Sequence, residues 1–438
     1  MKRKARRIFV CLIAGLLTSL DVVLAQQGDA RVAQEAARVL QQRCLGCHNQ
    51  PGAPQQRFLG SRAAMVQDGR VVPGRSEQSL LFQRMISGQR PMPPSGRLPE
   101  SELSIIKRWI DAGAPDWRDA GPTQPLDYTK ITLLGTLAGS ASKGAYRVNA
   151  VAFSPDGATL LSGEADGIKL WDVPTARLKL HHRTPDGKWE ALSVAFSSDN
   201  LLFAGSGTDA SGAPWAGVWD ARTGRLVRVI PVKSVVHSVS FLPNSDTLAL
   251  TTQNDRAKPL IMLSSATEER YLDGLKDAAR AVSCSPGGSL LAGASQSGTV
   301  TLWELRSDKE PRVLSLPGAD LKDGVHAVAF SPDGKLLASG GGDGVVRLWD
   351  TERGEVKTKF TVERPAPVRA VAFSPDGTVV AGGSEDKVLL WDVKTGEVKR
   401  TITAGVKVKA LAFSPNGRLL AIGGDSDDGK GVVVWGFK

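Results

Sequence analysis

Two cysteines and a histidine near the start of the chain have the spacing of a haem attachment site. Cys44 and Cys47 lie three residues apart, and His48 follows directly. On one helical turn the two thiols share a face, so both can add to the vinyl groups of a single porphyrin while His48 directs a ring nitrogen at the iron. We therefore expect one covalent haem c, attached through Cys44 and Cys47, with His48 as an axial iron ligand.

A Cys-x-x-Cys pair can also bind zinc or act as a redox dithiol. A zinc site would need a second pair of ligands, and the other two cysteines, Cys11 and Cys284, are isolated in the sequence. A thioredoxin-like motif would need a surrounding βαβ unit, which the neighbouring residues do not indicate. Haem attachment is the interpretation that these residues favour, and no disulfide framework is expected.

The sixth ligand of a haem iron separates electron transfer from catalysis. Met65 and Met85 lie in helical patterns beside apolar residues and are predicted to fill the core. Met92 lies in the proline-rich stretch 90–94, where an extended backbone can present its thioether to the iron. We predict Met92 as the second axial ligand, and a His/Met pair suits one-electron transfer.

The first 25 residues have the pattern of a secretory signal peptide. Five basic residues precede an apolar run at 8–20, and small residues surround Ala25, where a signal peptidase would cut. The apolar run is shorter than the roughly 20 residues that a spanning helix needs. We expect cleavage after Ala25 and export to the periplasm, where bacteria attach haem to such motifs. An uncleaved N-terminal anchor is the alternative, and no spanning segment is predicted in the mature protein.

Positive charge is concentrated near the haem motif. The chain has a formal net charge of +10, and residues 26–118 hold thirteen Lys or Arg against eight Asp or Glu, a balance of +5. This balance favours an acidic redox partner protein, with a mildly basic solvated surface as the alternative. Nucleic acid is not an expected partner, because export removes the usual target and basic and aromatic residues do not cluster.

Helical patterns surround the haem motif. Residues 30–42 lead into it, residues 76–86 follow it, and the pattern predicts a last helix at 99–112. The expected buried face of that last helix is Leu103, Ile106, Trp109 and Ile110. Residues 26–118 are therefore predicted to form a small all-α domain. Residues 119–128, which lack periodicity and contain two prolines, are predicted to be a linker.

Several motifs in this range resemble the planctomycete-type cytochrome c domains. They are Val72-Pro73-Gly74, Ser79-Leu80-Leu81, Met92-Pro93-Pro94 and Trp109-Ile110-Asp111-Ala112-Gly113-Ala114. The resemblance covers residues 35 to 115 and implies that Met92 is the distal ligand. The chain departs from the family at Pro99, where a Ser or Thr usually caps the last helix.

From Val148 onward the sequence repeats with a period near 43 residues. Equivalent positions are Phe153, Phe196, Phe241, Cys284, Phe330, Phe373 and Phe413. Each unit has an alternating apolar strand, a turn of the Ser-Pro-Asp-Gly type and a strand that ends near Trp-Asp. Seven copies predict an all-β, seven-bladed propeller of four-stranded blades over residues 129–438. The last unit lacks its fourth strand, so residues 130–137 are predicted to supply it and close the ring.

These units resemble WD repeats. Trp171-Asp172, Trp219-Asp220, Trp349-Asp350 and Trp391-Asp392 match the family, Trp303-Glu304 and Trp435-Gly436 nearly match it, and Leu263-Ser264 replaces the pair in the third unit. The Gly-His pair that the family often places before the inner strand is missing from every unit. The hydrogen-bonded tetrad that uses this His is therefore not carried over.

The second residue of the Val-x-x-Val stretch that opens each inner strand points to a possible binding surface. These residues are Asn149, Leu192, His237, Arg280, His326, Arg369 and Lys409. With the geometry of the WD-repeat family they would surround the mouth of the central channel. Three permanent cations and two histidines there would favour an acidic peptide or an anion, with unrelated solvated residues as the alternative.

The sequence thus predicts an exported monohaem cytochrome that transfers single electrons, with a WD-repeat propeller as a protein-docking scaffold. No catalytic residue is assigned, and an electron-transfer protein is favoured over an enzyme. One alternative is a periplasmic oxidoreductase whose propeller binds the substrate and whose haem accepts its electrons. The other is a scaffold in which the haem acts as a sensor.

Overall fold

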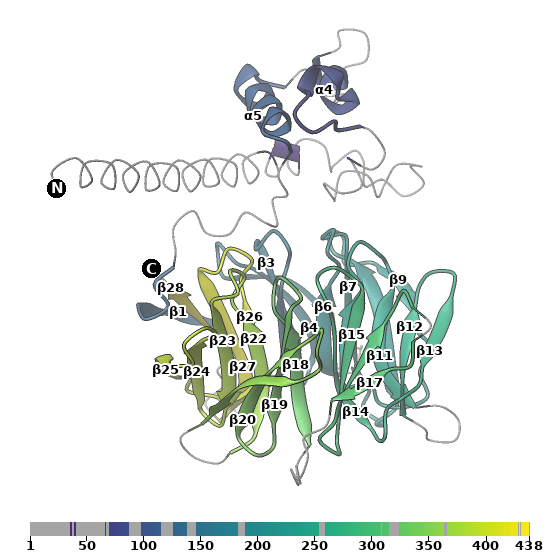
Figure 1. Cartoon of the computed structure of the whole chain (residues 1–438), viewed down its shortest axis with the longest axis vertical. Helices are drawn as coiled ribbons and strands as arrows, with labels where there is room; N and C mark the ends of the chain where they lie inside the picture. Colours follow the sequence, from purple (N-terminus) through teal and green to yellow (C-terminus); the bar gives the residue numbers. More distant parts are fainter. Residues whose placement is uncertain are drawn as a thin grey trace, which may run out of the picture. The chain divides into compact units, whose positions relative to one another are not determined.

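The computed structural model describes residues 36, 39–40, 66, 70–86, 98–114, 126–137, 146–182, 189–253, 259–307, 309–314, 324–362, 366–427, 429 and 431–437. The chain divides into two compact units, Met1–Pro125 and Leu126–Lys438, each of which is considered by itself (Figure 1). The boundary falls within the range 119–128 that the sequence assigns to the linker.

The regular elements among the described residues of the first unit are helices. They are η1 (Ser76–Gln78), α4 (Leu80–Ile86) and α5 (Glu100–Asp111). The predicted helix at 76–86 is interrupted at Ser79, whose hydroxyl donates to the Arg75 carbonyl at 2.9 Å and accepts from the Val72 N–H at 2.8 Å. A side chain that satisfies local backbone groups in this way competes with a continuous helix.

The helix α5 confirms the buried face expected from its sequence. Leu103, Ile106, Trp109 and Ile110 are all buried, and they pack with Phe82 and Met85 of α4 and with Ala36, Val39 and Leu40. Pro99 is the N-cap and supplies no side-chain hydrogen bond, as its identity requires. The helix ends at Asp111, and beyond its C-cap Gly113 adopts φ +91° while the Ala114 N–H donates to the Trp109 carbonyl at 2.9 Å.

Strands of the second unit form seven antiparallel groups of four within the described part of the chain. From the inner to the outer strand, blades 1 to 4 are β2 (Tyr146–Phe153), β3 (Thr159–Glu164), β4 (Gly167–Asp172), β5 (Arg177–His182); β6 (Glu190–Phe196), β7 (Leu202–Thr208), β8 (Pro214–Asp220), β9 (Leu226–Val229); β10 (Val239–Phe241), β11 (Leu248–Gln253), β12 (Pro259–Ser264), β13 (Glu269–Leu272); and β14 (Ala279–Cys284), β15 (Leu290–Ser295), β16 (Val300–Glu304), β17 (Arg312–Leu314). Blades 5 to 7 are β18 (Val325–Phe330), β19 (Leu336–Gly341), β20 (Val345–Asp350), β21 (Val356–Thr361); β22 (Val368–Phe373), β23 (Val379–Ser384), β24 (Lys387–Asp392), β25 (Val398–Thr403); and β26 (Lys407–Phe413), β27 (Leu419–Ser426), β28 (Val432–Phe437), β1 (Ile131–Leu137).

The ring closes as the sequence predicts. The inner strand of each blade contacts that of the next, and β26 of blade 7 contacts β2 of blade 1. The outer strand of blade 7 is β1, which pairs with β28 from Ile131↔Phe437 to Leu137↔Val432. Figure 1 shows blue β1 beside yellow β28, so the two ends of this unit meet in one blade. Blades 7 and 1 also join at the short pairing of β2 with β27.

The two middle strands of each blade are covered on both faces of the sheet. All six residues of β23 are buried, for example, because neighbouring blades cover it on both sides. Small residues there leave space for the repeat tryptophans. A Cβ on Gly382 would lie 2.8 Å from the Trp391 ring, and one on Gly293 would lie 2.9 Å from the Trp303 ring. The Ala and Gly content of these strands is thus a packing requirement.

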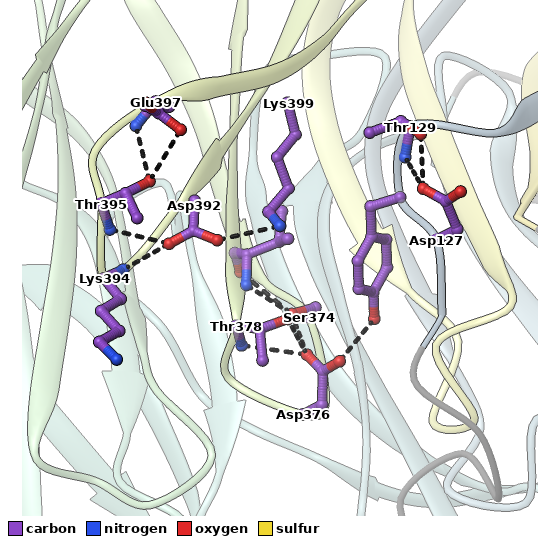
Figure 2. A network of polar contacts seen from close by, with 12 residues as sticks. Asp127, Thr129, Ser374, Asp376, Thr378, Asp392, Lys394, Thr395, Glu397 and Lys399 are labelled. Carbon is purple, nitrogen blue, oxygen red and sulfur yellow. Dashed lines mark hydrogen bonds and ion pairs between the residues drawn. The ribbon is translucent and has the colours of Figure 1, made fainter.

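Two kinds of turn recur in the blades, one of which the sequence predicts, and Figure 2 shows one of each in blade 6. In the Ser-Pro-Asp-Gly turn, Ser374 donates to Asp376 at 2.5 Å, and Gly377 adopts φ +70°. In the turn after Trp391, Asp392 accepts the N–H groups of Lys394 and Thr395 at 2.9 and 2.8 Å.

The residues just before β1 belong to the propeller. Tyr128, which the sequence assigns to the linker, is buried, and its ring packs edge-on against Phe413 and Phe437 at 6.0 and 4.9 Å between centroids. Its hydroxyl donates to Asp376 Oδ2 at 3.4 Å. This short segment therefore extends the closure of the ring beyond the β1–β28 pairing.

Candidate functional site

The residues predicted to bind haem, Cys44, Cys47, His48 and Met92, lie outside the described residues. Met65, predicted to fill the core, lies outside them as well. Met85, with the same prediction, is buried among the helices of the first unit. The candidate site that the structure describes is therefore on the propeller.

Each blade of the propeller contributes one side chain from the start of its inner strand. We call these the mouth residues: Asn149, Leu192, His237, Arg280, His326, Arg369 and Lys409. In six blades the pairing of the inner strand with the next strand skips the mouth residue, as between Val148 and Ala150 or between Val408 and Ala410. Each of these residues is thus the extra residue of a β-bulge, a device that redirects a side chain and is common beside functional sites.

Blade 3 reaches a similar arrangement by another route. Its inner strand β10 begins only at Val239, so His237 lies before it. The backbone N–H groups of His237 and Ser238 both donate to the Thr251 hydroxyl, at 3.0 and 3.2 Å. The Thr251 N–H also donates to the Ser238 carbonyl at 3.1 Å, so the Thr251 side chain adds to one remaining backbone bond.

Contacts between mouth residues cross from blade to blade. Lys409 of blade 7 donates to Asn149 Oδ1 of blade 1 at 3.3 Å. The amide of Asn149 donates to Glu190 Oε1 and to the Ala191 carbonyl of blade 2, at 3.2 and 3.1 Å. These bonds place the mouth residues of blades 7 and 1 on one face, at the edge of blade 2.

On blades 3 to 5 the mouth holds a cation between two histidines. The Arg280 guanidinium lies 2.9 Å from His326 Nδ1. Because arginine can only donate, this contact requires Nδ1 to accept, which leaves His326 neutral with its proton on Nε2. Burial, and then the charge of Arg280, lower the pKa of His237 below its usual value. Both histidines are therefore neutral at neutral pH in this arrangement.

The mouth is less cationic than the sequence predicts. The Lys409 ammonium lies 2.7 Å from Asp425 Oδ1 of β27, so its charge is offset locally. With both histidines neutral, Arg280 and Arg369 carry the remaining positive charge of the mouth residues. Sequence periodicity identified the mouth residues but did not predict that Asp425 pairs with Lys409. Asp425 lies on β27, the strand next to the inner strand, and does not occupy the same repeat position as Lys409.

Blade 1 contains a buried charged network that the sequence analysis missed. Lys169 and Glu164 have no exposed side-chain surface, and their charged atoms lie 2.6 Å apart. Lys169 also lies 3.0 Å from Asp166 and donates to the Tyr146 hydroxyl at 2.6 Å. The sequence feature that could have indicated this network is the single lysine in the otherwise apolar stretch 168–171. Arg347 and Asp343 form a similar ion pair in blade 5. Arg347, like Lys169, lies two residues before a repeat tryptophan.

A stacked pair of tryptophans lies beside the mouth on blade 2. Trp189 and Trp215 have ring centroids 4.2 Å apart and an interplanar angle of 11°. Both are partly buried, and both meet the edge of Trp219. Trp189 directly precedes Glu190, which binds Asn149, so the aromatic pair adjoins the polar contacts of the mouth.

Comparison with known families identifies WD40 repeats in the C-terminal region. The family described as "WD domain, G-beta repeat" matches residues 131–172, 269–304, 311–350, 356–392 and 396–433. The longest stretch between two of these matches is residues 173–268. It holds β5 to β12 and includes Leu263, which replaces the repeat tryptophan. The chain thus departs most from the repeat pattern in blades 2 and 3.

Three curated proteins show partial similarity. The small ribosomal subunit protein RACK1y of Oryza sativa subsp. japonica is 28% identical over 166 residues, 36% of this chain and 48% of that protein. The transcription initiation factor TFIID subunit 5 of Caenorhabditis elegans is 29% identical over 159 residues, 36% of this chain and 24% of that protein. The small ribosomal subunit protein RACK1 of Caenorhabditis elegans is 31% identical over 100 residues, 22% of this chain and 29% of that protein. The chain spans less than half the length of each relative.

Two further observations concern the described residues alone. None of their helices has the length and apolar character needed to cross a bilayer. They also hold no group of three or more His, Cys, Asp or Glu side chains that could bind a metal ion.

Proposed function

We propose that this chain is an exported monohaem c-type cytochrome whose WD-repeat propeller docks a redox partner protein. The propeller as a protein-interaction scaffold is the supported part, because the C-terminal region contains WD40 repeats. The observation that carries the docking site is the set of mouth residues, one from each blade, six of them presented by β-bulges. A rigid ring that presents side chains from all seven blades suits recognition of a protein surface better than a deep substrate cleft.

The electron-transfer part rests on the donor set of the first unit. Cys44 and Cys47 would hold the haem covalently, with His48 and Met92 as its axial ligands. Two thiols, an imidazole and a thioether are the groups that haem c uses. When bound, the haem supplies a one-electron redox couple. The chain would be exported by the signal at residues 1–25 and would act in the periplasm.

The partner surface would be acidic where it meets the mouth. Arginine is a permanent cation, which applies to Arg280 and Arg369, whereas Lys409 is already paired with Asp425. Electrostatic attraction of this kind raises the rate of encounter and is screened by salt. The two arginines are therefore the residues on which partner capture should depend most.

Haem attachment is tested by producing the full chain in a host competent in cytochrome maturation. Mass spectrometry should find one haem on the peptide that contains Cys44 and Cys47. The oxidised protein should have a sulfur-to-iron charge-transfer band that disappears in Met92→Ala. An unmodified peptide would contradict the proposal. A high-spin iron that binds cyanide readily would favour the oxidoreductase instead.

Docking is tested by charge reversal at the mouth. We expect Arg280→Glu with Arg369→Glu to weaken crosslinking to a periplasmic protein that carries a redox centre, and to slow electron exchange with it. Arg400→Glu, on the exposed outer strand β25, is the matched control and should change neither. Equal capture by both variants would show that the partner does not use the mouth.

A further inference from the structure

Blade 2 ends in an outer strand whose exposed side chains are mainly apolar. On β9, Leu226, Val227 and Val229 expose 55%, 58% and 65% of their surface. This strand is the last in its sheet and pairs only with β8 among the described strands. It therefore presents both a free backbone edge and apolar side chains to solvent.

The backbone register identifies which groups face outward. Arg228 pairs with Val218, and the Ile230 N–H donates to the Ala216 carbonyl at 3.0 Å. The pairing then steps to Leu226↔Trp219, so Val227 is the extra residue of a β-bulge. Val229 directs its N–H and C=O groups away from β8, because alternate residues of an antiparallel strand bond to the same side. The Val229 groups can accept a further strand without breaking any pairing inside the blade.

The strand β9 lacks the exposed lysines that some other outer strands have. Charged side chains commonly blunt exposed edges, and β21 has exposed Lys357 and Lys359 in alternate positions. The charged residue of β9 is Arg228, and its guanidinium donates to the Asp246 and Ser264 carbonyls of blade 3, at 3.3 and 3.1 Å. Its charge is thus turned toward the next blade and leaves the apolar edge open.

The sequence around this edge is rich in basic residues, although Asp246 and Glu269 act on Arg228 from the neighbouring blade. Residues 221–245 contain no Asp or Glu, whereas Arg222, Arg225 and Lys233 are all exposed. A strand that pairs with β9 would lie among these cations. A second copy of this chain is a poor match, because it would bring two sets of like charges together.

We propose that β9 is a docking edge for a partner segment that is extended and alternates apolar with acidic residues. The segment adds a fifth strand to blade 2. Its backbone bonds to Val229 give affinity, and its apolar side chains cover the exposed valines. Its carboxylates pair with Arg222 and Arg225. The edge lies on the outermost strand of blade 2, so this interaction is separate from docking at the mouth on the inner strands.

The test measures binding of a short synthetic peptide that alternates valine and glutamate to the full-length protein. We expect binding that weakens with salt, with an added strand detectable by isotope-edited infrared spectroscopy. The double substitution V227K/V229K should weaken binding by at least about tenfold, and a peptide with lysine in place of glutamate should bind at least about tenfold more weakly. Val398→Lys, on the exposed edge strand β25, should bind like the original protein.

Three results would overturn the proposal. They are unchanged binding by V227K/V229K, equal binding of the lysine peptide, and a dimer that V227K/V229K converts to monomer while the peptide does not bind. The last would identify the edge as an interface between copies. Val229→Lys alone is the milder variant should the double one fail to fold, and it should still weaken peptide binding.

Discussion

At the scale of single residues, Lys169 is a basic side chain with no exposed surface. It is wholly buried in blade 1, where Glu164 and Asp166 lie 2.6 and 3.0 Å from its ammonium group. Trp171 donates to Ser162 at 2.9 Å, and the Ser162 hydroxyl in turn donates to Glu164. Burial raises the pKa of Glu164 to about 8, although Lys169 opposes the rise. Removing Lys169 therefore leaves a buried carboxyl without the ion pair and hydrogen bond that favour its charged form.

We expect Lys169→Met to lower the free energy of unfolding by roughly 3–5 kcal/mol, the usual cost of breaking a buried ion pair. Urea unfolding measures the loss. The double substitution of Lys169→Met with Glu164→Leu should recover much of it, because an apolar pair can replace a buried ionic one. Lys179→Met, at an exposed position on β5, is the control and should have little effect. A small loss for Lys169→Met would show that the network contributes little to stability.

The residue scale also shows where sequence reasoning stops. The repeat predicted that the mouth residues occupy equivalent positions in their blades, and helical periodicity predicted that Leu103 and Trp109 of α5 are buried, because periodicity reports which way a side chain points. It did not predict that Asp425 offsets Lys409 or that Asp166 lies beside Lys169. Such pairs depend on the register between strands and on turn geometry, which no periodic signal encodes.

At the scale of elements, the turn after each Trp-Asp pair is the unit that the sequence specifies best. Asp392 accepts the N–H groups of Lys394 and Thr395, and Lys399 lies 2.9 Å from its other oxygen, as Figure 2 shows. Backbone hydrogen bonds from Thr395, and then the Lys399 side chain, lower the pKa of Asp392 to about 2. Hydrogen bonds in the same turn also lower the pKa of Asp172, chiefly from the Thr175 side chain, and of Asp350, chiefly from the Arg353 backbone.

The lowered pKa of Asp392 predicts how this turn responds to acid. Because the folded value lies below the usual 3.8, the carboxylate stabilises the fold above that pH, and this contribution is lost as the pH falls through about 2. We expect Asp392→Asn to be less stable than the original protein at pH 7, with the difference gone near pH 2. Unfolding by urea at several pH values measures this. Asp386→Asn, at an exposed position of the same blade, is the matched control for the substitution. A difference for Asp392→Asn that does not change with pH would contradict the account.

The ends of the helices in the first unit were harder to predict from the sequence than the ends of the strands in the propeller. The helical pattern at 76–86 did not reveal the break at Ser79, because the break comes from hydrogen bonds of one hydroxyl with Val72 and Arg75. The propeller sequence, by contrast, contains seven copies of one repeat. Strands and turns could be predicted because the same pattern of residues recurs in these copies.

At the scale of the whole molecule, closure of the ring is the feature that depends on both ends of the second unit. The count of strands predicted that residues before the first blade would complete the last one, and β1 does so. The count did not predict Tyr128, which lies outside any strand. Its ring is buried between Phe413 and Phe437, beside the turn of Asp376.

Tyr128 should therefore stabilise the closed ring through the packing of its ring more than through its hydroxyl. Tyr128→Ala removes a buried aromatic side chain, and we expect a loss of about 3–5 kcal/mol in the free energy of unfolding. Tyr128→Phe keeps the ring and removes only a 3.4 Å hydrogen bond, so it should lose about 1 kcal/mol or less. Hydrogen exchange should become faster in β1 and β28 of Tyr128→Ala before it does in blades 3 to 5, because the closure opens where the chain ends meet. Equal losses for both variants would assign the stabilisation to the hydroxyl, and uniform exchange around the ring would show that the closure is not its weakest point.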